Sequence, residues 1–146
     1  MATITFTESL IGRVYPGDLD ESYNVILLSS GITAGHALRQ DPTTGAYALT
    51  SATASGTAGF RGIALETNVA SGVVSILRRG VLYGYDLVAA GTAYDAPVYL
   101  GNAAGTLDTA PGAVSVLVGR VVSVTDPGRT QVLYIDSEYA SDGDLG

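Results

Sequence analysis

The fold is decided by a stretch that the chain repeats: GHALRQDPTTGAY at residues 35–47 is echoed by YDAPVYLGNAAGTL at residues 94–107. Each copy predicts a short apolar strand, a turn and a short return strand. Each is followed by a longer β-rich stretch built around a glycine and a second turn. These later halves read FRGIALE and GVVSIL in the first copy, and LVGRVVS and GRTQVLYI in the second. Two related β-modules in one chain predict an all-β fold with a small barrel-like or sandwich-like body.

Length and composition indicate one domain. At 146 residues the chain is long enough to bury a core without disulfides or metals. It contains no cysteine, which excludes thiol chemistry, disulfides and Cys-based zinc sites. No apolar run approaches the roughly 18 residues of a membrane helix, and the start MATITFT has no basic region before an apolar stretch. We therefore expect no membrane span and no secretory signal.

Charged residues are scarce. Only 14% of the residues are Asp, Glu, Lys or Arg, and lysine is absent, whereas an ordinary soluble domain has about 25%. Between residues 22 and 134 six arginines balance six acids, so the net charge of −7 resides at the two ends of the chain. A surface with few charges needs less desolvation when it packs against another surface. The composition therefore favours a protein that assembles with neighbours.

Three regions follow one another along the chain. Residues 1–24 open with TITFT, in which Ile4 and Phe6 share one face, and they predict an extended N-terminal arm. Residues 25–136 carry strand patterns at short intervals, separated by turn sequences such as DP, TG and PG, and predict a β-barrel-like domain. Residues 137–146, SEYASDGDLG, predict a flexible acidic tail.

Residue patterns typical of catalysis are sparse. His36 is the only histidine, and it has neither a second imidazole for a metal site nor a Ser and Asp pattern for a triad. The acidic run at Asp18, Asp20 and Glu21 lacks the glycine and the final glutamate of a calcium loop. The glycine-rich residues 55–59 lack the Lys-Ser/Thr of a phosphate loop and open no helix. We therefore expect no enzymatic activity, cofactor, metal or small-molecule substrate.

The arginines and tyrosines point to proteins rather than to nucleic acids as partners. The isoelectric point is about 4.3, and the only adjacent basic pair is Arg78 and Arg79, whereas phosphate recognition usually needs a basic stripe. These two arginines are either solvated at a strand end or contact a protein, because arginine forms bidentate pairs with carboxylates. Nine tyrosines and no tryptophan also suit a protein contact, although Tyr83 and Tyr85 alternatively pack inside the body.

Three stretches carry a family resemblance: GIALE at residues 62–66, SGVVSILRRGVLYGYD at 71–86 and GTAYDAPVYL at 91–100. Their succession resembles tailed-bacteriophage head decoration proteins, also called capsid cement proteins. In that family a Gly-Ile-Ala strand is followed by a strand ending in a Gly-Val turn, and a Gly-x-Pro-Val-Tyr strand belongs to the same pattern. The resemblance covers residues 35–136. It departs at Ala96, where the family often has Gly or Asp before the proline, and residues 1–24 match nothing in the family.

The resemblance implies a barrel-like or β-tulip-like body and a structural, non-enzymatic role. Such a protein is made in the host cytoplasm and resides in the virion, on the outer capsid surface. It forms a homotrimer that bridges major capsid subunits after head expansion, without nucleic-acid or membrane partners. The residues expected at the trimer or capsid interface are Ile4, Phe6, Leu10, Arg13, Tyr15, Arg78, Arg79, Tyr83 and Tyr85. The alternative from the tyrosines and the acidic ends is a virion-displayed module that binds carbohydrate or a host surface, with Tyr83 and Tyr85 as contacts.

Overall fold

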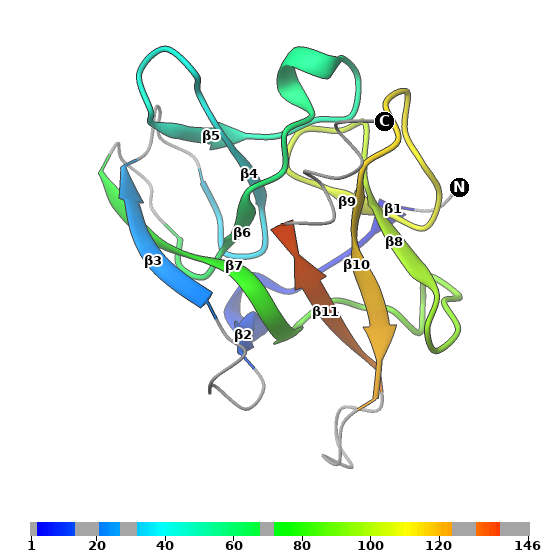
Figure 1. The fold of residues 1–146 in the computed structure, drawn as a ribbon. Helices are drawn as coiled ribbons and strands as arrows, with labels where there is room; N and C mark the ends of the chain where they lie inside the picture. The colour runs from blue at the N-terminus through cyan, green and yellow to red at the C-terminus, as the bar shows by residue number, and fades with distance from the viewer. Residues whose placement is uncertain (1–2, 14–20, 27–31, 68–71, 124–130, 138–146) are drawn as a thin grey trace.

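The computed structural model describes residues 3–13, 21–26, 32–67, 72–123 and 131–137. These residues build one curled antiparallel sheet with the shape of a half-barrel, together with two short 3₁₀ helices (Figure 1). The predicted all-β, barrel-like fold is therefore confirmed. The elements are β1 (Thr3–Ile4), η1 (Glu8–Leu10), β2 (Gly12–Arg13), β3 (Glu21–Ile26), β4 (Ala37–Gln40), β5 (Tyr47–Leu49), η2 (Ser55–Thr57), β6 (Gly62–Ala64), β7 (Val73–Tyr83), β8 (Pro97–Leu100), β9 (Leu107–Asp108), β10 (Leu117–Val122) and β11 (Val132–Asp136).

The strand order shows the two modules directly. The sheet runs β1-β9-β8-β10-β11-β7-β6-β4-β5, and β2 and β3 also pair with β7. In the first module β4 pairs with β5 and β6, and β6 pairs with β7. In the second module β8 pairs with β9 and β10, and β10 pairs with β11. The last strands of the two modules, β7 and β11, pair antiparallel, so the modules join at the centre of the sheet.

The hairpins that open the two modules share their register. Gln40 pairs with Tyr47 in the first hairpin, and Leu100 pairs with Leu107 in the second. These are matching positions of the sequence repeat, counted from the glycine of each turn. The loose sequence repeat therefore corresponds to equivalent residue pairs.

The later halves of the modules match in the same way, and a glycine sits at the same place in each. A Cβ on Gly62 would lie 2.9 Å from the carbonyl oxygen of Leu77, and a Cβ on Gly119 would clash with the carbonyl oxygen of Tyr134. Leu77 and Tyr134 are themselves matching positions, because each pairs with the residue that follows the glycine. Close approach of the neighbouring strand thus explains both glycines.

The apolar side chains form two clusters. The main core contains residues of both modules and of the N-terminal segment: Ile4, Ala37, Ala52, Ala58, Phe60, Ile63, Leu77, Leu82, Tyr85, Leu87, Val98, Leu100, Leu107, Val116, Val118, Val121, Leu133 and Ile135. The second cluster contains Val25, Ile32, Leu38, Tyr47, Ala64, Val74 and Ile76. None of its members comes from the second module. Strands β4, β6 and β7 contribute residues to both clusters, so they have apolar side chains buried on both faces.

A β-bulge at Arg78 explains how β7 serves both clusters. Opposite β3 the register shifts between Leu77 and Arg79, which leaves Arg78 as the extra residue. Because side chains alternate along a strand, a shift of one residue exchanges its two faces. The bulge therefore places Leu77 in the main core together with Leu82, while Ile76 lies in the second cluster.

Backbone hydrogen bonds connect the turn of the second hairpin to the first module. The Ala37 N–H donates to the carbonyl oxygen of Gly105 at 3.0 Å, and the Gly105 N–H donates to that of Thr50 at 2.7 Å. The Ala52 N–H donates to the carbonyl oxygen of Gly101 at 2.9 Å. These contacts join the two modules on the side away from the β7–β11 pair, and both glycines are buried there.

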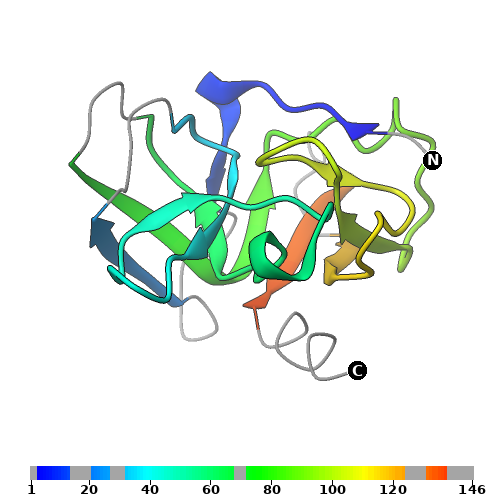
Figure 2. The ribbon, with the colours of Figure 1, turned by 90° about the horizontal axis from the view of Figure 1, so that it is seen from above.

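The described residues of the N-terminal segment are part of the body. Residues 3–13, which we call the strap, cross the sheet from β7 to β9 (Figure 2). Ile4 is 1% exposed within the main core, and burying such a side chain contributes about 2 kcal/mol. The domain boundary predicted at residue 24 falls inside β3, which pairs with β7 along its whole length. We therefore correct the separate arm, in its described residues, to strands within the sheet. The predicted tail, residues 137–146, is corrected at its start because Ser137 is buried, and residues 138–146 lie outside the described residues.

Candidate interaction surface

The described residues contain no candidate metal site. Within the ranges given above, no group of three or more His, Asp or Glu side chains could hold a metal ion. His36 lies beside Phe6, at a ring-centroid distance of 5.7 Å, and its Nδ1 accepts a hydrogen bond from the Thr33 N–H. No helix in the described part of the chain is long and apolar enough to cross a membrane.

Several residues expected at an interface lie instead within the fold. Ile4 and Tyr85 belong to the main core, and Phe6 packs against it. The Tyr85 hydroxyl donates to the carbonyl oxygen of Gly35 at 2.6 Å, and burial raises the pKa of this phenol. Ile4 and Tyr85 are therefore corrected to core residues, because a side chain enclosed by its own chain cannot meet a partner. The same burial leaves Tyr83 as the remaining tyrosine of the carbohydrate-binding alternative.

The other predicted residues have different positions. Leu10 is exposed, at 56% of its maximum, and Tyr83 is half-buried at the end of β7. Arg13 pairs with Leu82 in the sheet, and nothing is described of its side chain. Tyr15 lies outside the described residues.

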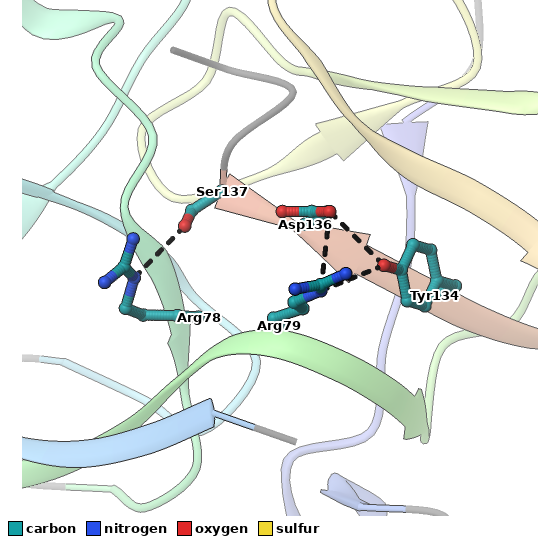
Figure 3. A network of polar contacts seen from close by, with 5 residues as sticks. All are labelled: Arg78, Arg79, Tyr134, Asp136 and Ser137. Carbon is teal, nitrogen blue, oxygen red and sulfur yellow. Dashed lines mark hydrogen bonds and ion pairs between the residues drawn. The ribbon is translucent and has the colours of Figure 1, made fainter. Parts of the chain in front are cut away.

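Arg78 and Arg79 take part in a network of polar contacts with the end of β11 (Figure 3). The Arg79 Nε lies 3.7 Å from the Asp136 Oδ2 and 3.4 Å from the Tyr134 hydroxyl. That hydroxyl donates to the same Asp136 oxygen at 3.3 Å, and the Arg78 Nε donates to the Ser137 Oγ at 3.3 Å. Asp136 is buried, and a buried carboxylate needs such partners because burial without them is costly. The network gives these arginines a role beyond the two that the sequence suggested, because their contacts link the two modules.

Beside this network, half-exposed side chains form a row across four strands. Tyr134 pairs with Val81 of β7 on one side and with Arg120 of β10 on the other, and Arg120 pairs with Pro97 of β8. Directly paired residues project to the same face of a sheet. Leu133 and Ile135, the neighbours of Tyr134 in the chain, are both in the main core, so this row lies on the opposite face.

We call this row, with Arg79, the Tyr134 face; it consists of Arg79, Val81, Pro97, Arg120 and Tyr134. All five residues are half-buried, and the side chain of Arg79 is 41% exposed. Tyrosine and arginine are the types enriched where proteins meet, because they combine a large contact area with hydrogen-bonding groups. Strands of a paired sheet hold these side chains in place, which lowers the entropy cost of binding.

The first module has no equivalent of this face. The positions that match Arg120 and Tyr134 are Ile63 and Leu77, and both are fully buried in the main core. In turn Ile76 of the second cluster matches Leu133 of the main core. Matching positions thus lie on opposite faces, and the half-exposed face belongs to the second module.

Sequence reasoning selected Arg79 but missed Tyr134 and Arg120. A signal for them was present in the repeat, because polar or amphipathic residues replace Ile63 and Leu77 at matching positions. Comparisons with protein-family models, with curated proteins and with solved structures found no match to this chain. The site therefore rests on the geometry alone.

Proposed function

We propose that this protein is a structural, non-enzymatic component of a virion that binds the outer surface of an expanded bacteriophage capsid. It acts as a trimer that bridges major capsid subunits and so stabilises the shell. The single observation that carries the proposal is the Tyr134 face, a half-exposed row of tyrosine, arginine, proline and valine on strands of a paired sheet. The scarcity of charge in the body and the resemblance of residues 35–136 to capsid cement proteins support it.

The stabilisation follows from mass action. A protein that binds only the assembled, expanded shell shifts the equilibrium toward that shell, in proportion to the logarithm of its saturation. Many copies add many modest interfaces that have to break together before the shell ruptures. The protein needs no chemistry for this role, only a rigid surface that matches its neighbours.

Co-sedimentation with purified expanded capsids, together with native mass spectrometry of the free protein, tests the proposal. We expect saturable binding and a trimer, either free or formed on the shell. Tyr134→Ala should weaken binding at least about tenfold, as truncation of a central tyrosine does at protein interfaces. Val88→Ser is the matched control, because Val88 is 68% exposed on the turn at residues 87–91, outside the strands that carry the Tyr134 face, and it should bind as the wild type does. Absence of binding to expanded capsids overturns the proposal.

A further inference from the structure

The strap is seated by one aromatic side chain. The Phe6 ring lies so close to Gly35 that a Cβ there would be 2.6 Å from the ring, and Gly35 has a φ of +99° that other residues rarely adopt. The ring lies nearly perpendicular to that of His36, at an interplanar angle of 83°, and contacts Tyr85 at a centroid distance of 5.6 Å. The lack of a side chain at Gly35 therefore leaves room for Phe6, and the His36 imidazole lines one side of the space that the Phe6 ring occupies.

Two backbone hydrogen bonds fix the strap around this seat. The Thr7 N–H donates to the carbonyl oxygen of Gly84 at 3.0 Å, and the Asp86 N–H donates to that of Thr5 at 2.8 Å. Strands β4 to β11 pair with one another without the strap. Loosening of the strap around Phe6 would thus break these two hydrogen bonds and leave the pairing of the two modules in place, without requiring Ile4 to leave the main core.

His36 is held in its neutral form. Its Nδ1 accepts the Thr33 N–H at 3.1 Å, so this nitrogen carries no proton and the Nε2 carries one. Protonation of Nδ1 would break this hydrogen bond and place a positive charge in a half-buried position beside the Phe6 ring, where the loss of hydration is costly. Burial lowers the pKa of His36, and the nearby charge of Glu8 opposes this by raising it.

The other surroundings of His36 carry no further charge. Besides its contact with Phe6, the imidazole adjoins Gly105 in the turn of the second hairpin, and Leu49 adjoins the same glycine. That turn, residues 101–106, contains no ionisable side chain, and burial keeps Tyr85 neutral by raising its pKa. Among the described residues Glu8 of the strap is the charged group that acts on His36.

We propose that His36 is an acid-sensitive latch for the strap: protonation of its imidazole loosens the strap around Phe6, at residues 5–7, while the two modules stay folded. The sign follows from linkage. With the strap docked, His36 resists protonation; with the strap released, its pKa returns toward the ordinary value of about 6.5. Strap docking is therefore strongest above that value and weakens as the pH falls through it toward the lowered pKa of the docked state.

The experiment combines histidine NMR with amide exchange on the full chain. Because His36 is the only histidine, its ring signals report its pKa without any mutation. Amide protection factors of Thr7 and Asp86 report strap docking, and those of Leu100 and Val121, whose N–H groups bond to carbonyls of the body, report the modules. Between about pH 8 and pH 5 we expect protection of Thr7 and Asp86 to fall by up to about tenfold per pH unit below the ordinary pKa. Leu100 and Val121 should keep theirs.

Three variants sharpen the result. His36→Asn keeps an acceptor near the Nδ1 position but does not titrate, so the selective loss of protection should disappear. Phe6→Ala should raise the His36 pKa, because docking and protonation affect each other reciprocally; Glu8→Gln should lower it. The proposal is overturned if the wild-type strap amides follow those of the modules, or if His36→Asn shows the same acid loss. It is also overturned if His36 titrates at or above its ordinary pKa, a result that needs no variant to fold.

Discussion

The two modules have the same strands, the same registers and a glycine at the same place, yet they use their faces differently. Ile63 and Leu77 of the first module are fully buried, whereas the matching Arg120 and Tyr134 of the second are half-exposed. The repeat therefore determines which residues pair, whereas the elements packed on each face of the sheet determine which residues are buried. The bulge at Arg78 and the added strand β3 bury both faces of the first module. In the second module one face stays half-exposed at Arg120 and Tyr134.

The largest expected effect on stability comes from giving one module the residue that the other has at the matching position. Ile63→Arg places an unpaired charge in the main core and should destabilise the protein by about 4 kcal/mol, because a buried charge without a partner is costly. The counterpart Arg120→Ile replaces a half-exposed side chain and should change the free energy of unfolding by less than about 1 kcal/mol. Urea denaturation followed by circular dichroism measures both. Equal losses would mean that the two modules do not differ in burial.

Truncation in the strap tests how far the second module depends on the N-terminal segment. Ile4→Ala removes a fully buried side chain from the core beside β9 and should cost about 3 kcal/mol, through lost transfer free energy and the cavity left behind. Leu10→Ala, in the same segment but 56% exposed, should cost less than about 0.5 kcal/mol. Thermal and urea unfolding compare the two. If Ile4→Ala is as mild as its control, the strap is dispensable for stability and the separate arm returns.

The matched glycines sharpen the claim that the modules share one strand pairing. Gly62→Ala and Gly119→Ala each force a Cβ toward a carbonyl oxygen of the neighbouring strand. Both should destabilise by about 2 kcal/mol, since overpacking of this kind costs about 1–3 kcal/mol, with Gly119 the more affected because its contact is closer. Gly59→Ala is the control, because no atom lies within 4 Å of the place that its new Cβ would take. An unchanged midpoint for Gly119→Ala in denaturant titration would contradict the close approach of β10 and β11.

The smallest expected effect concerns the pH dependence of the turns in the two hairpins. Asp41 begins the exposed turn of the first hairpin, and its Oδ1 accepts the N–H groups of Thr43 and Thr44; these hydrogen bonds lower the pKa of this carboxyl. The matching Gly101 is buried and has no side chain that could accept such hydrogen bonds, although residues 102–104 at the tip of that turn are exposed. Acidification below the ordinary pKa of aspartate should therefore loosen the first turn alone, because stability gained from a lowered pKa is lost as the pH falls through it. NMR exchange of the Thr43 and Thr44 amides reports this, and Asp41→Asn should remove the pH dependence.

Much of the fold could be predicted from the sequence, because strand patterns and turn residues are local signals. The repeat around Gly45 and Gly105 located both hairpins, and the glycine in each later half located the strand pairs. The place of the N-terminal segment could not be read in this way. Ile4 and Phe6 alternate as in any amphipathic strand, and only the folded sheet decides whether their face meets the core or a partner.

The candidate site was less predictable for a related reason. The Arg78 and Arg79 pair was visible as charge, but the bulge at Arg78, which interrupts the regular alternation of side chains along β7, depends on pairing with β3, far away in the sequence. Tyr134 and Arg120 became a surface only because β11 and β10 lie side by side with their other face in the core. A single sequence records which residues are present but not which side of a strand is covered by distant elements.

The measurement that tests the central claim most directly is a cryo-electron-microscopy map of an expanded capsid decorated with this protein. We predict that the Tyr134 face is covered by a major capsid subunit or by a neighbouring copy, with Arg120 and Tyr134 near the centre of the contact. A map in which this face points into solvent while the protein is bound through other surfaces would contradict the account.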